Sequence, residues 1–174
     1  MVLLITLGLA RDERMAVVVL PSLAQGAVPA GLTRTVEKAL LEGVSEISGF
    51  RVVELLAEDR KALVEDPRCR EQSACLADRV PLGTELVIDP RVAKHGGVLS
   101  VELRLLRDGK LSRRHASAVT VATADDYALG ECELLLAGWA RDERLYKLAA
   151  EGNKKAREEL ELRFPTSPWT QALR

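Results

Sequence analysis

The pattern of hydrophobic and polar positions predicts a chain in which strands and helices alternate. In its first half, short continuous apolar runs are typical of buried strands. Apolar residues that recur every three or four positions indicate amphipathic helices. The predicted elements are residues 15–21 (strand), 32–47 (helix, ended by Ser48-Gly49), 50–55 (strand), 57–64 (helix) and 74–80 (helix).

The middle third of the chain changes to a period of two, which predicts antiparallel strands. One strand begins at Leu86, and residues 99–105 alternate apolar with polar as a half-buried strand does. Asp108-Gly109 is a strong signal for a two-residue hairpin into a strand at residues 111–123. Small residues on one face of that strand are expected to let a helix approach closely; they are Ala116, Ala118, Thr120 and Ala122.

Two more helices are predicted, one starting near Thr123 and one over residues 142–163. The order β-α-β-α-β-β-β-α predicts an α/β (α+β) fold: a mixed sheet of about five strands, helices packed on one face, and an extra C-terminal helix. We divide the chain into residues 1–14 (apolar, signal-like, with a charged junction), 15–140 (the α/β domain) and 141–174 (a C-terminal helix and tail).

The C-terminal part faintly resembles half of a tetratricopeptide unit. One unit cannot bury its own apolar face, so this part either packs on the α/β domain or docks to another chain. We expect it to close the core, with Trp169 as its anchor.

Composition excludes several classes of function. The 174 residues hold 25 Lys and Arg against 26 Asp and Glu, a net charge of −1, which excludes a general nucleic-acid binder. The 47% hydrophobic content excludes a disordered chain, and 3% aromatic residues leave few rings for stacking on bases.

The first ten residues are apolar throughout and precede a charged stretch at residues 11–14. Ten residues cannot span a membrane as a helix, which needs about 20. They match the apolar part of a secretory signal, with Gly8-Leu9-Ala10 as a cleavage site but without a basic start. The alternative is a buried strand or a tail packed on the core. We favour export to the periplasm or an envelope-associated site.

Cys69 and Cys75 are separated by five residues, enough to close a loop if a turn lies between them. Two ordinary thiols and a metal site are the alternatives, although a zinc site would need tighter spacing and a second pair. We favour a disulfide, which requires an oxidising compartment, as export does. Cys132 falls in an apolar helical pattern and is predicted to be a core thiol.

No motif supports catalysis, so we predict no enzyme, no catalytic residue, no metal site and no cofactor. The sequence has neither a glycine-rich phosphate loop nor a nucleophile elbow. His95 lies at a predicted hairpin tip, and His115 lies on a strand face expected to be solvated.

Positive charge is concentrated around the second hairpin, at Arg104, Arg107, Lys110, Arg113 and Arg114. This cluster could meet an acidic partner. Charges of this kind also protect a hairpin edge from aggregation, so both explanations stay open.

A known family shares the order of these features. The strand at residues 16–21 ends in proline, and after a helix come Phe50-Arg51-Val52-Val53-Glu54, then Cys69 and Cys75 with five residues between, then Leu82-Gly83 and a meander. Over residues 15–139 the chain resembles the TolB amino-terminal-domain family. Its relatives include the curli-assembly lipoprotein CsgG and the periplasmic lipoprotein activators of penicillin-binding proteins.

The resemblance implies a non-catalytic, exported adaptor that binds other envelope proteins, without nucleic acid and without integral membrane segments. The alternative is a sensor of a small molecule or a peptidoglycan fragment. The chain departs from the family at Asp89-Pro90, where proline cannot donate to a strand ladder. We therefore expect an edge or a bulge around Ile88, open to a partner strand, and we count Trp169 among the possible docking residues.

Overall fold

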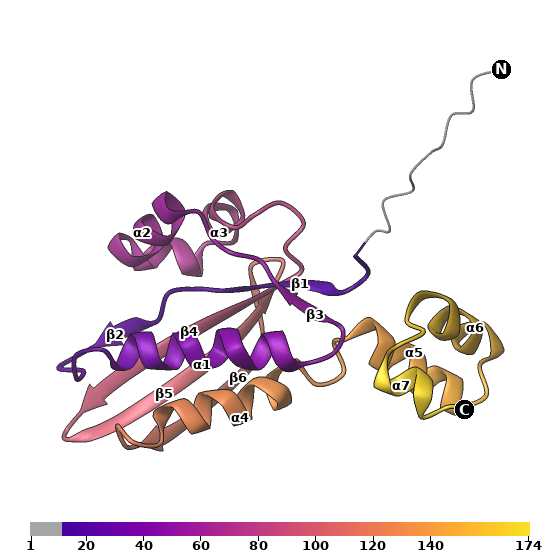
Figure 1. Ribbon diagram of the computed structural model, residues 1–174. Coiled ribbons are helices and arrows are strands. Elements are labelled where there is room, and N and C mark those ends of the chain that lie inside the picture. Colours follow the sequence, from indigo (N-terminus) through magenta and orange to yellow (C-terminus); the bar gives the residue numbers. More distant parts are fainter. Residues whose placement is uncertain (1–11) are drawn as a thin grey trace.

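A computed structural model describes residues 12–174, so the predictions for the apolar segment at residues 1–10 lie outside the described residues. Figure 1 shows a sheet with helices on both sides and a group of helices at one end. The strands are β1 (Met15–Val19), β2 (Leu23–Gln25), β3 (Phe50–Val52), β4 (Leu86–His95), β5 (Val98–Arg107) and β6 (Lys110–Val119). The helices are α1 (Leu32–Glu46), α2 (Ala57–Glu65), the 3-10 helix η1 (Pro67–Glu71), α3 (Ser73–Arg79), α4 (Ala124–Leu136), α5 (Arg141–Ala150), α6 (Lys154–Arg163) and α7 (Pro168–Gln171).

The sheet is mixed, with strand order β3-β1-β4-β5-β6. β1 runs parallel to β3 and β4, while β4, β5 and β6 form an antiparallel meander. The short β2 also pairs in parallel with β4, beyond the end of β1. The predicted α+β class is confirmed, and β2 is an additional strand inside a stretch whose sequence indicates only turns.

β1 is buried on both faces, and this determines where the helices pack. Successive side chains of a strand point to opposite faces. Val17 and Val19 therefore join the larger core, beneath α1 and α4, with Leu40 and Cys132 from those helices. Val18 joins a smaller core on the opposite face.

The prediction that helices pack on one face needs a correction. α2, η1 and α3 cover one end of the second face, where Leu63, Cys69 and Leu76 pack around Val18 and Val87. The physical reason is that an apolar strand such as β1 must be covered on both sides. No helix of the described part of the chain covers the remainder of the second face, over β5 and β6 (Figure 1).

The hairpin prediction is confirmed, but the prediction for the small residues of β6 is wrong. Asp108 and Gly109 both have positive φ, 51° and 69°, as a two-residue hairpin turn requires. The register pairs Leu103 with His115 and Glu102 with Ala116. Ala116 consequently shares the uncovered face with Glu102 and is exposed, whereas α4 packs over the face of His115.

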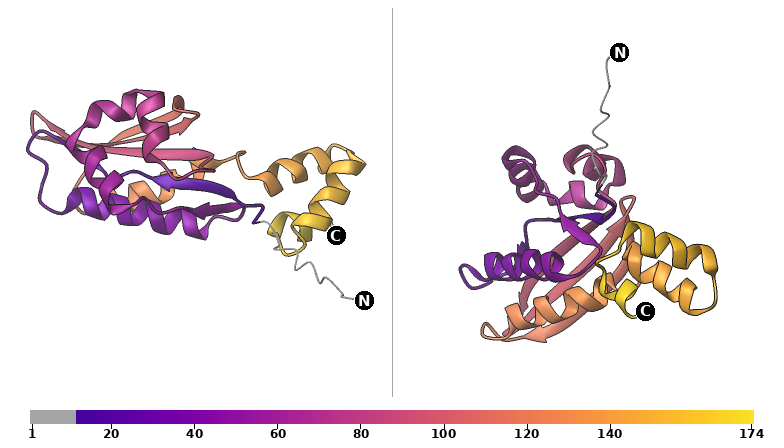
Figure 2. Two further views of the ribbon diagram at one scale, coloured as in Figure 1. Left: turned by 90° about the horizontal axis from the view of Figure 1, so that it is seen from above. Right: turned by 45° about the vertical axis from the view of Figure 1, so that its right-hand side comes forward.

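The C-terminal helices form an extension at one end of the sheet and do not close the core (Figure 2). The predicted single helix is two, because Gly152 turns the chain with φ 94° and Asn153 caps α6. Asp142, 1% exposed, joins the extension to the α/β body: it accepts hydrogen bonds from Ser48 Oγ and Ser167 Oγ, each at 2.8 Å. None of the helices within residues 12–174 has both the length and the apolar character needed to cross a membrane.

Candidate functional site

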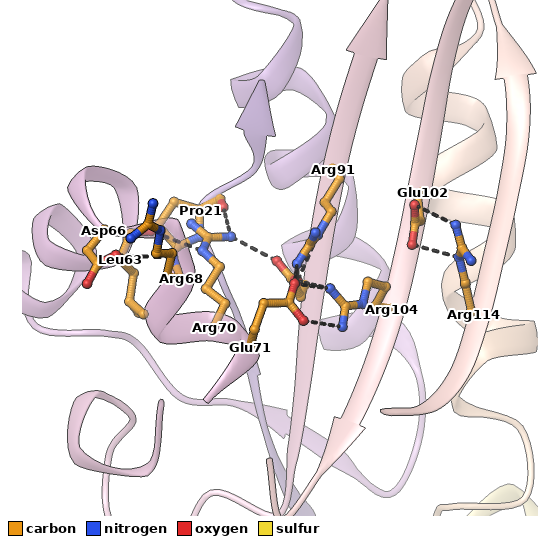
Figure 3. A network of polar contacts seen from close by, with 11 residues as sticks. Pro21, Leu63, Asp66, Arg68, Arg70, Glu71, Arg91, Glu102, Arg104 and Arg114 are labelled. Atoms are coloured by element: carbon orange, nitrogen blue, oxygen red, sulfur yellow. Dashed lines mark hydrogen bonds and ion pairs between the residues drawn. The ribbon is translucent and has the colours of Figure 1, made fainter. Parts of the chain in front are cut away.

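A disulfide closes the loop between α2 and α3. Cys69 and Cys75 are bonded, with Cα atoms 5.2 Å apart, so the predicted bridge is confirmed over the alternatives of free thiols or a metal site. Asp66 caps η1 by accepting a hydrogen bond from a backbone N–H two residues on. The loop is thereby fixed over the sheet, where η1 presents Arg70 and Glu71 to β4 (Figure 3).

Arg70 and Asp89 form an ion pair in which neither side chain is exposed. Arg70 Nη1 donates to Asp89 Oδ1 at 2.9 Å and to the carbonyl of Pro21 at 2.7 Å. Its Nε donates to the carbonyl of Leu63 at 3.0 Å, while Nη2 is buried with no hydrogen-bond acceptor within residues 12–174. Burial lowers the pKa of the Arg70 guanidinium, and the hydrogen bond to Asp89 opposes that shift.

A second carboxylate, that of Glu71, covers this pair at the surface. Arg104 donates to both oxygens of Glu71, at 2.7 and 3.1 Å, and Arg91 donates to Glu71 and to Asp89 Oδ2. The hydrogen bonds from Arg104 and Arg91 lower the pKa of Glu71 to about 2. Glu71 therefore stays ionised near neutral pH and connects two guanidinium groups that the sheet places side by side.

The row of charges continues across the uncovered face of the sheet. Arg114 on β6 pairs with Glu102 on β5 at 2.7 Å, and the Arg114 side chain is 61% exposed (Figure 3). Four guanidinium groups thus face three carboxylates. The inner members are hydrogen-bonded to one another, whereas Arg114, at the outer end, is exposed and can also bind a carboxylate of another molecule.

Ile88 and Pro90, two of the predicted docking residues, are buried, and the prediction of an edge at this point is wrong. β4 lies inside the sheet, with β5 on one side and β1 and β2 on the other. The backbone N–H of Leu20 bonds to the carbonyl of Ile88, and residues at alternate positions of a strand direct their backbone to the same side. The backbone of Pro90 therefore faces the gap between β1 and β2, where no carbonyl of the described strands is left without a donor by the missing N–H.

The predicted basic cluster at the second hairpin is only partly available to a partner. Arg113 donates to the carbonyls of Leu134 and Leu135, at the end of α4, and its guanidinium lies 5.8 Å from the ring centre of Trp139. Arg104 is largely buried and belongs to the row of charges already described. Arg107, Lys110 and Arg114 remain exposed.

Trp169 does not reach the core of the α/β body. It lies in α7, with its ring 5.0 Å from that of Tyr146 on α5. On its other side it lines a cavity between α1, α4 and α7. Trp169 therefore lies at a surface, and its role in docking stays a prediction.

The two histidines lie in different surroundings. His95 is exposed at the end of β4. His115 is half-buried under α4, and its Nδ1 lies 2.6 Å from Glu131 Oε2, so the expected solvated position is wrong. Within residues 12–174, no group of three His, Cys, Asp or Glu residues is placed to hold a metal ion.

Sequence reasoning missed the roles of Arg70, Glu71 and Arg91. One signal was present: Asp89 directly follows the apolar run at residues 86–88, and a carboxylate buried there needs a cation as partner. The sequence does not reveal which of the many arginines supplies it, because the pairing depends on how the disulfide loop folds over β4.

Comparison with known proteins shows likenesses of fold. No protein-family model and no curated protein matches the chain. Among solved structures, lipoprotein GNA1162 from Neisseria meningitidis has 17% identity and a TM-score of 0.46, over 60% of this chain and 78% of that one.

The LpoB C-terminal domain from Salmonella enterica has 14% identity and a TM-score of 0.42, over 61% of this chain and 82% of that one. The L103M variant of the PelC dodecamer from Paraburkholderia phytofirmans has 13% identity and a TM-score of 0.39, over 74% of this chain and 89% of that one. Likenesses at this level concern the fold alone and assign no function.

Proposed function

We propose that the chain is a non-catalytic protein-interaction domain of a bacterial cell envelope, which binds an extended acidic segment of a partner protein along β6. The observation that carries this proposal is that β6, ten residues long, is the last strand of the sheet. No strand within residues 12–174 pairs with its outer side. An exposed edge strand offers a row of unpaired N–H and C=O groups to another chain.

The register identifies the backbone groups that a partner strand would meet. The backbone carbonyl of Ile88 bonds towards β1, so the backbone groups of the odd-numbered β4 residues point to β5. The β5 residues that pair with them are even-numbered, and their backbone groups point to β4. Odd-numbered β5 residues then pair with His115 and its odd-numbered neighbours. The N–H and C=O groups of Arg114, Ala116 and Ala118 are left directed away from the sheet.

Charge favours an acidic partner over a neutral one. β6 carries Lys110, Arg113, Arg114 and His115 and contains no Asp or Glu. Arg107 lies opposite Lys110 at the hairpin end and is also exposed. Acidic side chains on an added strand would therefore meet exposed cations along this edge.

The disulfide supports the compartment that we propose. Disulfides persist in oxidising environments such as the bacterial periplasm and are rare in the cytosol. The resemblance of the sequence to the TolB amino-terminal-domain family supports the same compartment and an adaptor role.

The test uses amide hydrogen exchange on the whole chain, with and without a synthetic ten-residue peptide in which Glu alternates with Val. We expect the peptide to protect the amides of Arg114, Ala116 and Ala118, which point outward. Ala116→Pro removes one outward N–H without touching a ladder bond, so it should abolish the protection. Ala116→Thr keeps the N–H and is the matched control, which should bind as the parent does.

Two results would contradict the proposal. One is unchanged exchange along β6 at millimolar peptide. The other is equal protection by a peptide with Lys in place of Glu, since the exposed cations would then play no part. If the charges only protect the edge from aggregation, replacing Lys110 and Arg114 by glutamine should cause self-association without altering peptide binding.

A further inference from the structure

A second surface, remote from β6, has the form of a binding groove. It lies between the C-terminal half of α1, the outer side of α4, and α7, which crosses its end. Figure 1 shows α1 and α4 side by side under the sheet. The cavity has a volume of about 730 Å³, within the range of roughly 300–1,000 Å³ of typical ligand sites.

The helices approach closely at one point, and the groove opens beside it. A side-chain carbon built on Gly43 would lie 3.1 Å from Cys132 Cβ, so the two helices touch there. Gly130 lies on the exposed side of α4, and a side-chain carbon built there would have no atom within 4 Å, so the groove is open at this point. The lining of α4 extends from Asp126 to Ala137, which is about 16 Å along the helix axis, or three helical turns.

The floor is apolar and the rim is acidic. Ile47, Leu129 and Leu136 lie along the floor, and Trp169 lies at the α7 end. Four carboxylates line the groove, and among residues 12–174 no lysine or arginine does; the carboxylates are Glu46, Asp126, Glu133 and Glu143.

One of these carboxylates is neutralised by a neighbour. Glu143 bonds to Lys147, which helps to lower its pKa despite the opposing effect of burial. The other three, Glu46, Asp126 and Glu133, form no ion pair within residues 12–174 and carry uncompensated negative charge on both banks.

From this combination we infer that the groove binds an amphipathic helix of a partner protein, with an apolar stripe flanked by lysine or arginine. Three turns of a helix match the length of the groove, and helix-in-groove binding uses apolar residues at positions i, i+3 or i+4, and i+7. The flanking cations would meet the unpaired carboxylates, which raises the rate of association and selects the partner. This surface is separate from β6, so the inference does not depend on the proposed function.

The test measures binding of a helical peptide to the whole chain by calorimetry. The peptide has an Ala-rich backbone, one Leu stripe and Lys on both flanks. Glu133→Lys should weaken binding at least about tenfold, because it places like charge in the groove. Glu42→Lys makes the same charge change on an exposed position of α1 outside the lining and should leave the affinity within about twofold.

A steric variant separates lost binding from lost folding. Gly130→Leu places a side chain in open space inside the groove and replaces glycine in a helix interior, which favours the helix. We expect this variant to unfold at the same or higher temperature than the parent and to lose peptide binding. Ala116→Pro on β6 should leave peptide binding unchanged, so failure here and failure of the proposed function can be told apart.

The inference is overturned by any of four outcomes. The first is full binding by Gly130→Leu. The second is equal weakening by Glu42→Lys and Glu133→Lys, which would indicate unspecific charge attraction. The third is equal binding of a scrambled peptide of the same charge. The fourth is assembly of the free chain that Glu133→Lys abolishes, because a second copy of the chain would then be the occupant.

Discussion

Replacing Asp89 by asparagine tests whether the buried ion pair holds the disulfide loop against the sheet. Asparagine has nearly the same volume, so packing is preserved, but the negative charge is lost and an N–H₂ donor replaces one of the two oxygens that accept from arginines. Arg70, with no exposed side-chain surface, would then keep a positive charge without its carboxylate partner.

The expected loss follows from the surroundings of this pair. Removing one partner of a buried ion pair costs about 3–5 kcal/mol, because the other charge is left uncompensated. We expect the lower end, about 3 kcal/mol, since Arg91 and Arg104 keep Glu71 as an acceptor. That is a large share of the roughly 5–15 kcal/mol by which a domain is stable.

The assay is urea unfolding followed by circular dichroism, with a linear extrapolation in which the slope should stay unchanged. Two controls limit the interpretation. The double variant Arg70→Met, Asp89→Leu should recover part of the loss, because apolar replacement of a buried pair is about neutral. Recovery is incomplete because the carbonyls of Pro21 and Leu63 lose their donor. Glu102→Gln, which breaks an exposed pair, should cost less than about 1 kcal/mol. A loss below about 1 kcal/mol in Asp89→Asn, or no recovery in the double variant, would refute the reasoning.

Three further predictions concern Glu71, Cys132 and the disulfide. The pKa of Glu71 is about 2 in the folded chain, below its ordinary value of 4.5. Its ion pairs therefore stabilise the fold fully above about pH 4.5, and this contribution is lost as the pH falls towards 2. Because the Glu71 side chain is half-exposed, Glu71→Gln should remove up to about 1 kcal/mol of this acid dependence, measured by urea unfolding across this pH range. Burial raises the pKa of the Cys132 thiol to about 12, so iodoacetamide at about pH 8 should label it only after unfolding, as mass spectrometry would show; rapid labelling of the native chain would contradict its placement in the core. Replacing Cys69 and Cys75 together by alanine should lower the unfolding free energy by about 2 kcal/mol, and an unchanged value would show that the loop is ordered without the bridge.

The parts of the fold that the sequence could predict rest on local signals. The continuous apolar run of β1 needs burial on both faces, and the helical spacing from Leu32 to Val44 needs one buried side. The hairpin at Asp108-Gly109 depends on two residues that accept positive φ. Each of these signals is contained in a few neighbouring positions, so no knowledge of the tertiary structure was needed.

The parts that could not be predicted depend on contacts between distant positions. Arg70 and Asp89 are 19 positions apart, and Glu71 and Arg104 are 33 positions apart. The prediction of an edge at Pro90 considered only its missing N–H and not the gap between β1 and β2 that makes it harmless. The sequence predicts a single helix across Gly152 because charged residues at helical spacing continue on both sides of it.

Among the candidate docking residues, some positions follow from local signals and others depend on contacts between distant residues. Exposure of Lys110 and Arg114 follows from a charged hairpin and was predictable. The place of Trp169 beside an acid-rimmed groove was not, because it depends on Asp142 holding α7 near the end of α1.

The unequal covering of the sheet has an evolutionary consequence. Substitutions in β1 and at residues 86–88 of β4 affect a core on each side, so they are restricted to apolar residues of similar size. On the uncovered face, positions such as Ala116 and Ala118 have no core neighbours to accommodate. Descendants of this chain can therefore change that face quickly and acquire new binding specificities while the architecture that supports it is conserved.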